Sequence, residues 1–151
     1  MKLAEALAER SAIRKRLDIL ATRMENNTKV YEDETPVEEP EVLLKELDTL
    51  TARYDELIFM INTANSKTVA SNGETLVKLL ARRDAMKIKV DLLHRMLRST
   101  DKESFYHRSK DQPKEVVTIN VASLRKEADD LSRMARETDA LIQEANWITE
   151  I

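Results

Sequence analysis

Cysteine is absent from this chain of 151 residues, and residues that break helices are scarce, with one glycine and three prolines. The lack of cysteine excludes a disulfide framework, a thiolate nucleophile and cysteine-ligated zinc. A single glycine excludes a glycine-rich phosphate loop and the G-x-S-x-G turn of serine hydrolases. The chain also has no run of about 18 apolar residues, the length that a membrane-spanning helix requires. Its first ten residues include two glutamates where a signal peptide would be apolar, so we expect a cytoplasmic protein.

Charged residues, by contrast, make up 35% of the chain, and leucine and alanine are frequent, which is typical of long helices. Two segments repeat apolar residues in steps of three and four, the heptad pattern of helices that bury one narrow stripe. The first comprises Leu43, Leu47, Leu50, Tyr54, Leu57, Ile61 and Ala64, and the second Val121, Leu124, Ala128, Leu131, Ala135, Thr138, Ile142 and Ala145. We therefore predict an all-α protein, either an antiparallel four-helix bundle or long helical hairpins with coiled-coil-like packing.

Length and breaker residues divide the chain into segments. One domain is the expectation for this length, so we predict a single helical domain over residues 1–151. Residues 31–40 combine two prolines with a run of acidic residues, which predicts a loop. The predicted helices cover about 2–30, 40–65, 75–98 and 120–146.

The connections between the later helices carry other signals. The Asn72-Gly73 pair predicts a tight turn, because both residues tolerate positive φ. Residues 99–119 are irregular, and the β-branched segment 116–120 predicts a short strand. Pairing of this strand with 104–108 or with 67–70 would give a small β-hairpin cap near 104–120. Trp147 and Ile148 are expected to fold back onto the end of the bundle.

Charge is divided unevenly among the predicted helices. The first and third carry an excess of basic residues, and the second and fourth an excess of acidic ones. Opposite charges favour neighbours in an up-down-up-down arrangement. Further apolar residues beside the seams suit either a four-helix monomer or hairpins that dimerise, and we expect a homo-oligomer. These residues are Leu44, Ile58, Leu80, Ile88, Leu92 and Leu141.

Metal and catalytic motifs are incomplete. A di-iron site would need two Glu-x-x-His pairs, whereas Asp91 with His94 is a single related pair. Glu127 and Asp130 match the second element, E-x-x-D, of all-α MazG-type nucleotide pyrophosphohydrolases, which makes them candidate magnesium ligands. The first element, E-E-x-x-E, fails because Val42 replaces its third glutamate. We expect no catalytic residue and no cofactor.

Polar residues at helix seams form the other candidate site. Arg83 falls on the seam of the third helix, and Asn62 and Asn65 lie at the end of the second. A buried arginine needs an acid, for which Asp129, Asp130 and Asp139 are the candidates. These residues indicate either an internal polar layer that fixes the helix register, which we favour, or a ligand pocket. The net charge of −3 and the pI near 5.6 do not favour nucleic acid as a partner.

Four segments together resemble the septicolysin-like family of small bacterial helical proteins, and the resemblance extends over essentially the whole chain. They are Lys2–Arg10, Leu80–Asp84, Leu124–Leu131 and Ile142–Trp147. The resemblance implies no catalytic residues, and the family name implies a cytolysin. We expect no such activity on physical grounds, because the sequence shows neither an export-signal pattern nor an aromatic-rich membrane tip.

The sequence therefore predicts an architecture rather than a reaction. We expect a non-enzymatic, cytoplasmic helical-bundle protein that acts through interaction, assembles with itself and has a protein partner of unknown identity. A membrane-active protein is the first alternative, and a magnesium-dependent nucleotide hydrolase is the second.

Overall fold

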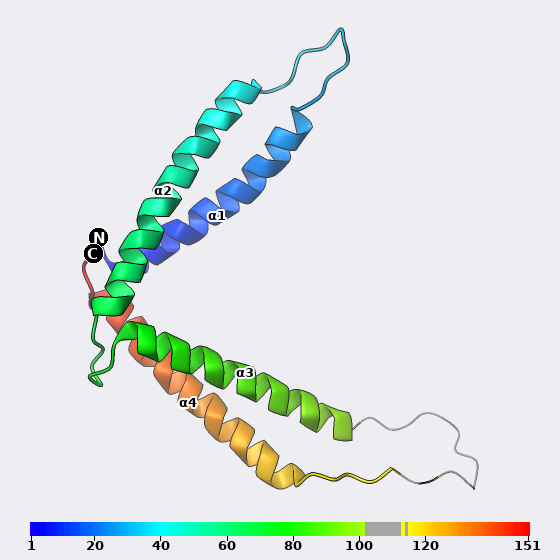
Figure 1. Cartoon of the computed structure of the whole chain (residues 1–151), viewed down its shortest axis with the longest axis vertical. Coiled ribbons are helices and arrows are strands. Elements are labelled where there is room, and N and C mark those ends of the chain that lie inside the picture. Colours follow the sequence, from blue (N-terminus) through cyan, green and yellow to red (C-terminus); the bar gives the residue numbers. More distant parts are fainter. Residues whose placement is uncertain (102–112, 114) are drawn as a thin grey trace. The chain divides into compact units, whose positions relative to one another are not determined.

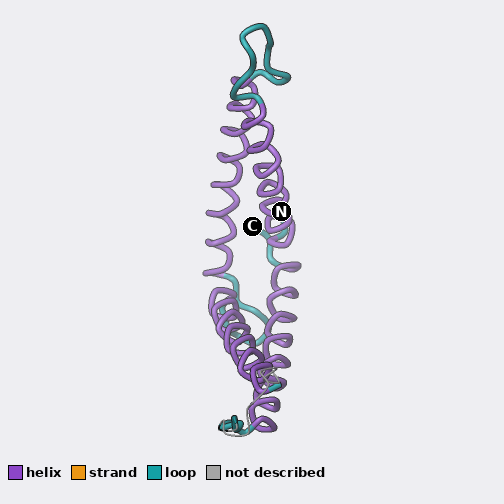
Figure 2. The backbone as a smooth tube through the Cα atoms, turned by 90° about the vertical axis from the view of Figure 1, so that its right-hand side faces the viewer, coloured by secondary structure: helices purple, strands orange, loops and turns teal. Residues whose placement is uncertain are grey.

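The computed structural model describes residues 1–101, 113 and 115–151. They form four helices (Figure 1): α1 (Leu3–Asn26), α2 (Pro40–Lys67), α3 (Leu76–Thr100) and α4 (Val121–Ile148). Figure 2 shows helices joined by loops, and no strand occurs in the described part of the chain. The all-α prediction is confirmed. The internal contacts form two compact units, the first made of Met1–Leu76 with Gln143–Ile151 and the second of Val77–Ile142.

The first unit is built on an antiparallel hairpin of α1 and α2 (Figure 1). The heptad seam of α2 is its buried face, as predicted, while Leu47 and Tyr54 on the same seam are half-buried. The buried residues of the two helices are Leu3, Ala6, Ile13 and Leu20 from α1, and Leu43, Leu50, Leu57, Ile61 and Ala64 from α2. One narrow apolar stripe on each helix therefore holds the hairpin together.

Residues from the two ends of the chain join within the first unit. Lys2 and Glu150 form an isolated antiparallel β-bridge, and the Leu3 amide donates to the Thr149 carbonyl at 2.9 Å. The Lys2 ammonium also lies 2.6 Å from a Glu150 carboxylate oxygen. The first unit is therefore completed by a segment that follows the whole of the second unit in sequence.

A tight turn follows α2, as the Asn72-Gly73 pair predicts. Gly73 has φ +82°, and its amide donates to the Ala70 carbonyl at 2.9 Å. Val69 and Thr75 form an isolated bridge across the turn. Glycine suits this position because its missing Cβ removes the steric cost of positive φ.

The second unit contains most of α3 and α4, which lie side by side in Figure 1. Leu79, Met86 and Leu97 of α3 are buried. On the predicted seam of α4, four residues of this unit are buried: Ala128, Ala135, Thr138 and Ile142. Val121, Leu124 and Leu131 on that seam are half-buried.

Three predictions about the segments between and after the helices need correction. The first helix ends at Asn26 rather than near residue 30, because the Asn27 side chain bonds to the Arg23 carbonyl and accepts from the Glu38 amide. The predicted strand is absent: residues 115–120 are irregular, and Val116 and Val117 are 78% and 57% exposed. A strand there would need a partner strand and an apolar surface to cover, and the exposed valines have neither among the residues that the structure describes.

The end of the last helix also differs. Trp147 and Ile148 do not fold back but continue α4, and they are 64% and 67% exposed. The Thr149 amide still donates to the Ala145 carbonyl at 3.0 Å, so helical bonding extends to the final turn. Of the β-cap, residues 104–108 lie outside the described residues. Val69 of the other predicted partner segment is bridged to Thr75 instead of to 116–120.

Candidate functional site

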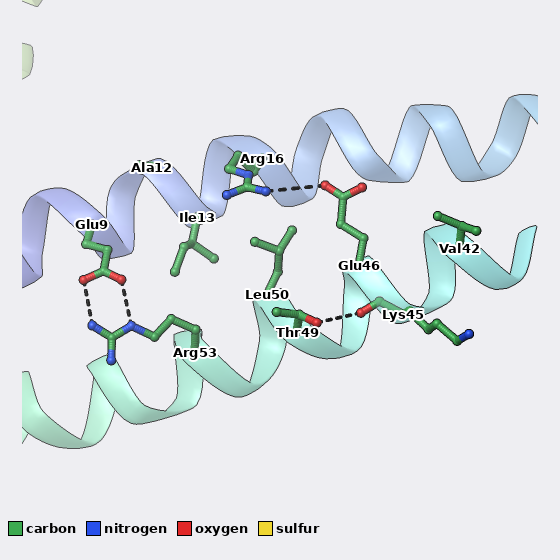
Figure 3. A pocket seen from close by; sticks show the side chains of 10 residues that line it. All are labelled: Glu9, Ala12, Ile13, Arg16, Val42, Lys45, Glu46, Thr49, Leu50 and Arg53. Atoms are coloured by element: carbon green, nitrogen blue, oxygen red, sulfur yellow. Dashed lines mark hydrogen bonds and ion pairs between the residues drawn. The ribbon is translucent and has the colours of Figure 1, made fainter. Parts of the chain in front are cut away.

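An open groove of about 550 Å³ lies between α1 and α2 in the first unit (Figure 3). The helices α1 and α2 supply both walls because their apolar stripes face each other, and Ile13 and Leu50 lie between the charged residues. Ala12, Val42 and Thr49 add small or apolar surface. The charged lining residues are Glu9, Arg16, Lys45, Glu46 and Arg53.

Ion pairs cross this groove at two places, on either side of Ile13 and Leu50 (Figure 3). Arg53 donates from Nε and Nη2 to the two Glu9 oxygens at 2.7 and 2.8 Å. These hydrogen bonds lower the pKa of Glu9 against a smaller opposing effect of burial, and they raise the pKa of Arg53. Arg16 Nη2 lies 3.6 Å from Glu46 Oε1. These charges are matched within the protein, which suits a contact surface better than proton transfer.

A polar cluster at the tip of the hairpin orders the loop between α1 and α2. Arg23 donates to Glu38 in the loop and to Glu46 of α2, the latter at 2.9 Å. The Arg23 hydrogen bonds outweigh burial and hold the pKa of Glu38 below its usual range. The buried Asn27 side chain accepts from the Glu38 amide at 2.9 Å. Sequence reasoning missed this cluster, although a buried asparagine on an apolar seam was its one signal.

The second unit has its own polar cluster around Arg83, on the seam of α3. The half-buried Arg83 guanidinium donates to Asp84 at 2.8 Å and to Asp139 of α4 at 3.3 Å. Lys87 also contacts Asp139, at 3.0 Å. Burial raises the pKa of Asp139, but the hydrogen bonds from Lys87 and Arg83 outweigh it, and the pKa is lowered. Of the three acids proposed for Arg83, the structure places Asp139 beside it.

A small hollow of about 220 Å³ lies next to this cluster, and Lys87 and Asp139 are among its lining residues. The other predicted members of the polar layer lie elsewhere. Asp129 and Asp130 are exposed, and Asp130 is 3.4 Å from Arg133. In the first unit, Asn62 is exposed and Asn65 is half-buried.

The two candidate magnesium ligands, Glu127 and Asp130, form ion pairs with basic side chains of the protein. Glu127 lies 2.6 Å from the ammonium of Lys89, and Asp130 contacts Arg133. Within residues 1–101, 113 and 115–151, no group of three or more His, Asp or Glu side chains is arranged to hold a metal ion. The described helices also include none that is long and apolar enough to cross a membrane.

A second apolar surface lies on α3, on the side away from its buried seam. We call it the outer face of α3 and define it by Val77, Ala81, Ala85, Ile88, Leu92 and Met96, all of which are exposed. Ile88 and Leu92 are 64% and 55% exposed, and Val77 and Met96 are 51% and 46% exposed. Sequence reasoning noted Ile88 and Leu92 as additional apolar positions but missed the stripe, whose signal is the recurring spacing of four.

The similarities to known proteins extend over essentially the whole chain, but none of these proteins has a stated function. A crystal structure of a functionally unknown conserved protein from Corynebacterium diphtheriae is similar, with 37% sequence identity and a TM-score of 0.92. The similarity covers 100% of this chain and 98% of that one. A comparison with curated proteins gives no match, and neither similarity carries the septicolysin-like name. Residues 2–151 match the Family of unknown function (DUF6847), and the chain belongs to this family.

Proposed function

We propose that this protein is a non-enzymatic helical interaction protein of the cytoplasm that assembles with itself and, through the assembly, with a protein partner. The observation that carries the proposal is the outer face of α3. Four large apolar side chains, Val77, Ile88, Leu92 and Met96, are each about half exposed or more. Contiguous exposed apolar surface in a water-soluble protein is typical of an interaction site.

The small size of each helical hairpin supports the same proposal. Two helices that meet along one seam bury a limited apolar area, and most helical stability in proteins comes from tertiary packing of an apolar face. The seam of α4 contributes small residues such as Ala128 and Ala135. A further helix against α3 would bury large side chains and increase the stability of the unit.

The groove between α1 and α2 supports a role in contact rather than in catalysis. Its charged side chains Glu9, Arg53, Arg16 and Glu46 bind one another across the two helices. A charged rim around apolar residues such as Ile13 and Leu50 is the pattern of a protein contact surface. In this proposal the groove receives a side chain or helix of the partner.

Sedimentation velocity across the micromolar range tests self-association. We expect a species larger than one chain of 17.4 kDa, with a weight that rises with protein concentration. A single species of one chain at every concentration would contradict the proposal of self-association.

Two further assays separate the alternatives. The septicolysin-like resemblance makes membrane activity the first alternative, and release of dye from liposomes at micromolar protein would favour it. Glu127 and Asp130 make magnesium-dependent nucleotide hydrolysis the second. Turnover of a nucleoside triphosphate that is lost in the Glu127→Gln variant would favour hydrolysis over interaction.

A further inference from the structure

We infer that the outer face of α3 is the contact between two copies of this chain, with the two α3 helices parallel and related by a twofold axis. This inference rests on the proposed function and names the partner and the geometry of one surface. It is carried by the spacing of the exposed apolar residues and by the charges on either side of them.

The apolar residues of the outer face form two ridges. Val77, Ala81 and Ala85 are spaced by four residues, and so are Ile88, Leu92 and Met96. At 3.6 residues per turn, the six residues fall within about 100° of the helix circumference. Ridges with a spacing of four fit the grooves between similar ridges when two helices cross at about −50°. The outer face is thus shaped for contact with another helix of the same kind.

The small residues lie where such helices approach most closely. Ala81 and Ala85 precede Ile88 by seven and three residues, so alanine and isoleucine lie near the middle of the stripe. Alanine lets the helix backbones come close, and the larger side chain fills the groove beside it. The buried residues Leu79 and Met86 lie roughly 150° away around the helix, so this contact leaves the intramolecular seam in place.

Charged residues of opposite sign border the two sides of the outer face. Lys78, Arg82 and Lys89 lie along one side, and Asp84 and Asp91 along the other, all of them exposed. In a parallel pair of helices, the left side of one helix meets the right side of its copy, as in the e and g positions of parallel coiled coils. The basic side of each copy then faces the acidic side of the other.

An antiparallel pair would be electrostatically worse. In an antiparallel pair, the basic side of one helix lies beside the basic side of the other, and the two acidic sides also lie together. Like charges that face each other oppose association. Arg95 lies on the acidic side near the end of the stripe. Helices that cross at about −50° diverge toward their ends, so Arg95 and Lys78, at opposite ends of the stripe, are both distant from the crossing point. The charges that remain near the crossing are Arg82 and Lys89 on one side and Asp84 and Asp91 on the other. The charge pattern therefore selects a second copy in the parallel orientation.

A matched pair of substitutions tests the surface. Ile88→Lys places a charge in the middle of the outer face, whereas Ile19→Lys makes the same change at an isoleucine of α1 that is also exposed, 61% against 64%. We expect Ile88→Lys to weaken self-association at least tenfold and Ile19→Lys to leave it unchanged, as measured by sedimentation. Circular dichroism shows whether each variant keeps its helices.

The outcomes distinguish this inference from the proposed function. If Ile88→Lys assembles as tightly as the unmodified chain, the outer face is not the contact, while self-association itself stands. If the unmodified chain does not assemble at all, both proposals fail.

The absence of cysteine permits a direct test of orientation. A spin label on Ser99→Cys, an exposed position near the end of α3, reports the distance between the two copies. In a parallel pair the labels lie at the same end of the crossed helices. In an antiparallel pair centred near residue 87 they would be about 36 Å apart along the helix axis, from a rise of 1.5 Å per residue. A label distance well below 30 Å supports the parallel contact, and one well above it overturns that orientation.

Discussion

Arg53 of α2 binds Glu9 of α1 through two parallel hydrogen bonds, Nε to Oε1 at 2.7 Å and Nη2 to Oε2 at 2.8 Å. The pair reverses the overall pattern of charge, because here the basic residue belongs to the more acidic helix. A bidentate arginine–carboxylate pair fixes direction as well as distance. It therefore sets the register of α1 against α2 at one end of the groove.

Replacing Glu9 by Gln is expected to lower the Tm slightly. Both side chains are more than a third exposed, so solvent and salt screen the pair. We expect a loss of no more than about 3 °C, and a smaller loss in high salt. Differential scanning calorimetry at two salt concentrations measures both effects. Glu25→Gln, at an exposed position of the same helix, is a control, and an equal loss there would remove the special role of the pair.

Acid should destabilise the protein through carboxylates that bind arginine. The folded-state pKa values of Glu9 and Glu38 lie below the ordinary 4.5. A depressed pKa contributes stability above the unfolded value and loses it as pH falls through the folded value. We expect the Tm to fall below about pH 4.5 and to fall less in a Glu9→Gln, Glu38→Gln double variant. Equal acid sensitivity of that variant would show that other carboxylates are responsible.

Leucines on opposite faces of α2 should differ sharply in their contribution to the free energy of unfolding. Leu57 is fully buried and Leu44 is 50% exposed. Leu57→Ala removes core contacts and leaves a cavity, so we expect a loss of about 2–5 kcal/mol in the free energy of unfolding. Leu44→Ala should change it by less than about 1 kcal/mol. Urea titration measures both, and similar losses would mean that α2 buries a different face.

Arg83→Leu should leave stability nearly unchanged. The side chain lies on the apolar seam of α3, and Asp139 keeps its contact with Lys87 when Arg83 is removed. Removing one partner of an ion pair is costly when it leaves the other charge uncompensated. Lys87 still compensates the half-buried Asp139, so we expect a change within about 1 kcal/mol of zero. Arg98→Leu, at an exposed position of the same helix, is the control. A loss above about 3 kcal/mol in Arg83→Leu would show that Asp139 depends on the guanidinium.

Gly73→Ala tests the backbone conformation of the turn after α2, because the substitution introduces no steric contact. A Cβ at Gly73 would meet nothing within 4 Å, but φ is +82°. The cost is therefore conformational, about 1–2 kcal/mol. Gly73→Asn should cost less, because asparagine tolerates this region better. Urea titration compares the two variants, and no loss in Gly73→Ala would mean that the turn adopts another conformation.

The sequence predicted the helices well because their signal is local and repeated. Leu43, Leu50 and Leu57 recur in one register, and each is buried as expected. The opposite charges of neighbouring helices also reappear as contacts, such as Arg83 with Asp139 and Lys89 with Glu127. A single periodic preference, repeated over many turns, outweighs local exceptions.

The parts that sequence reasoning missed depend on distant partners. Val116 and Val117 have high strand propensity, but a strand forms only where another strand pairs with it, and propensity does not predict that partner. Arg23 and Glu38 are 15 residues apart and meet only because the loop turns back onto α1. The outer face of α3 was missed for another reason. The helix α3 has apolar residues on two opposite faces, so a search for a single seam finds the face of Leu79 and Met86 and overlooks the other.

The bridge between Lys2 and Glu150 has a consequence for synthesis on the ribosome. Translation proceeds from the amino terminus, and domains generally fold in that order. Here Thr149 and Glu150 emerge only after the entire α3–α4 segment, although their partners Lys2 and Leu3 are made before the rest of α1. The edge of the α1–α2 hairpin at Lys2 and Leu3 must therefore stay unpaired until residues 149 and 150 have been synthesised.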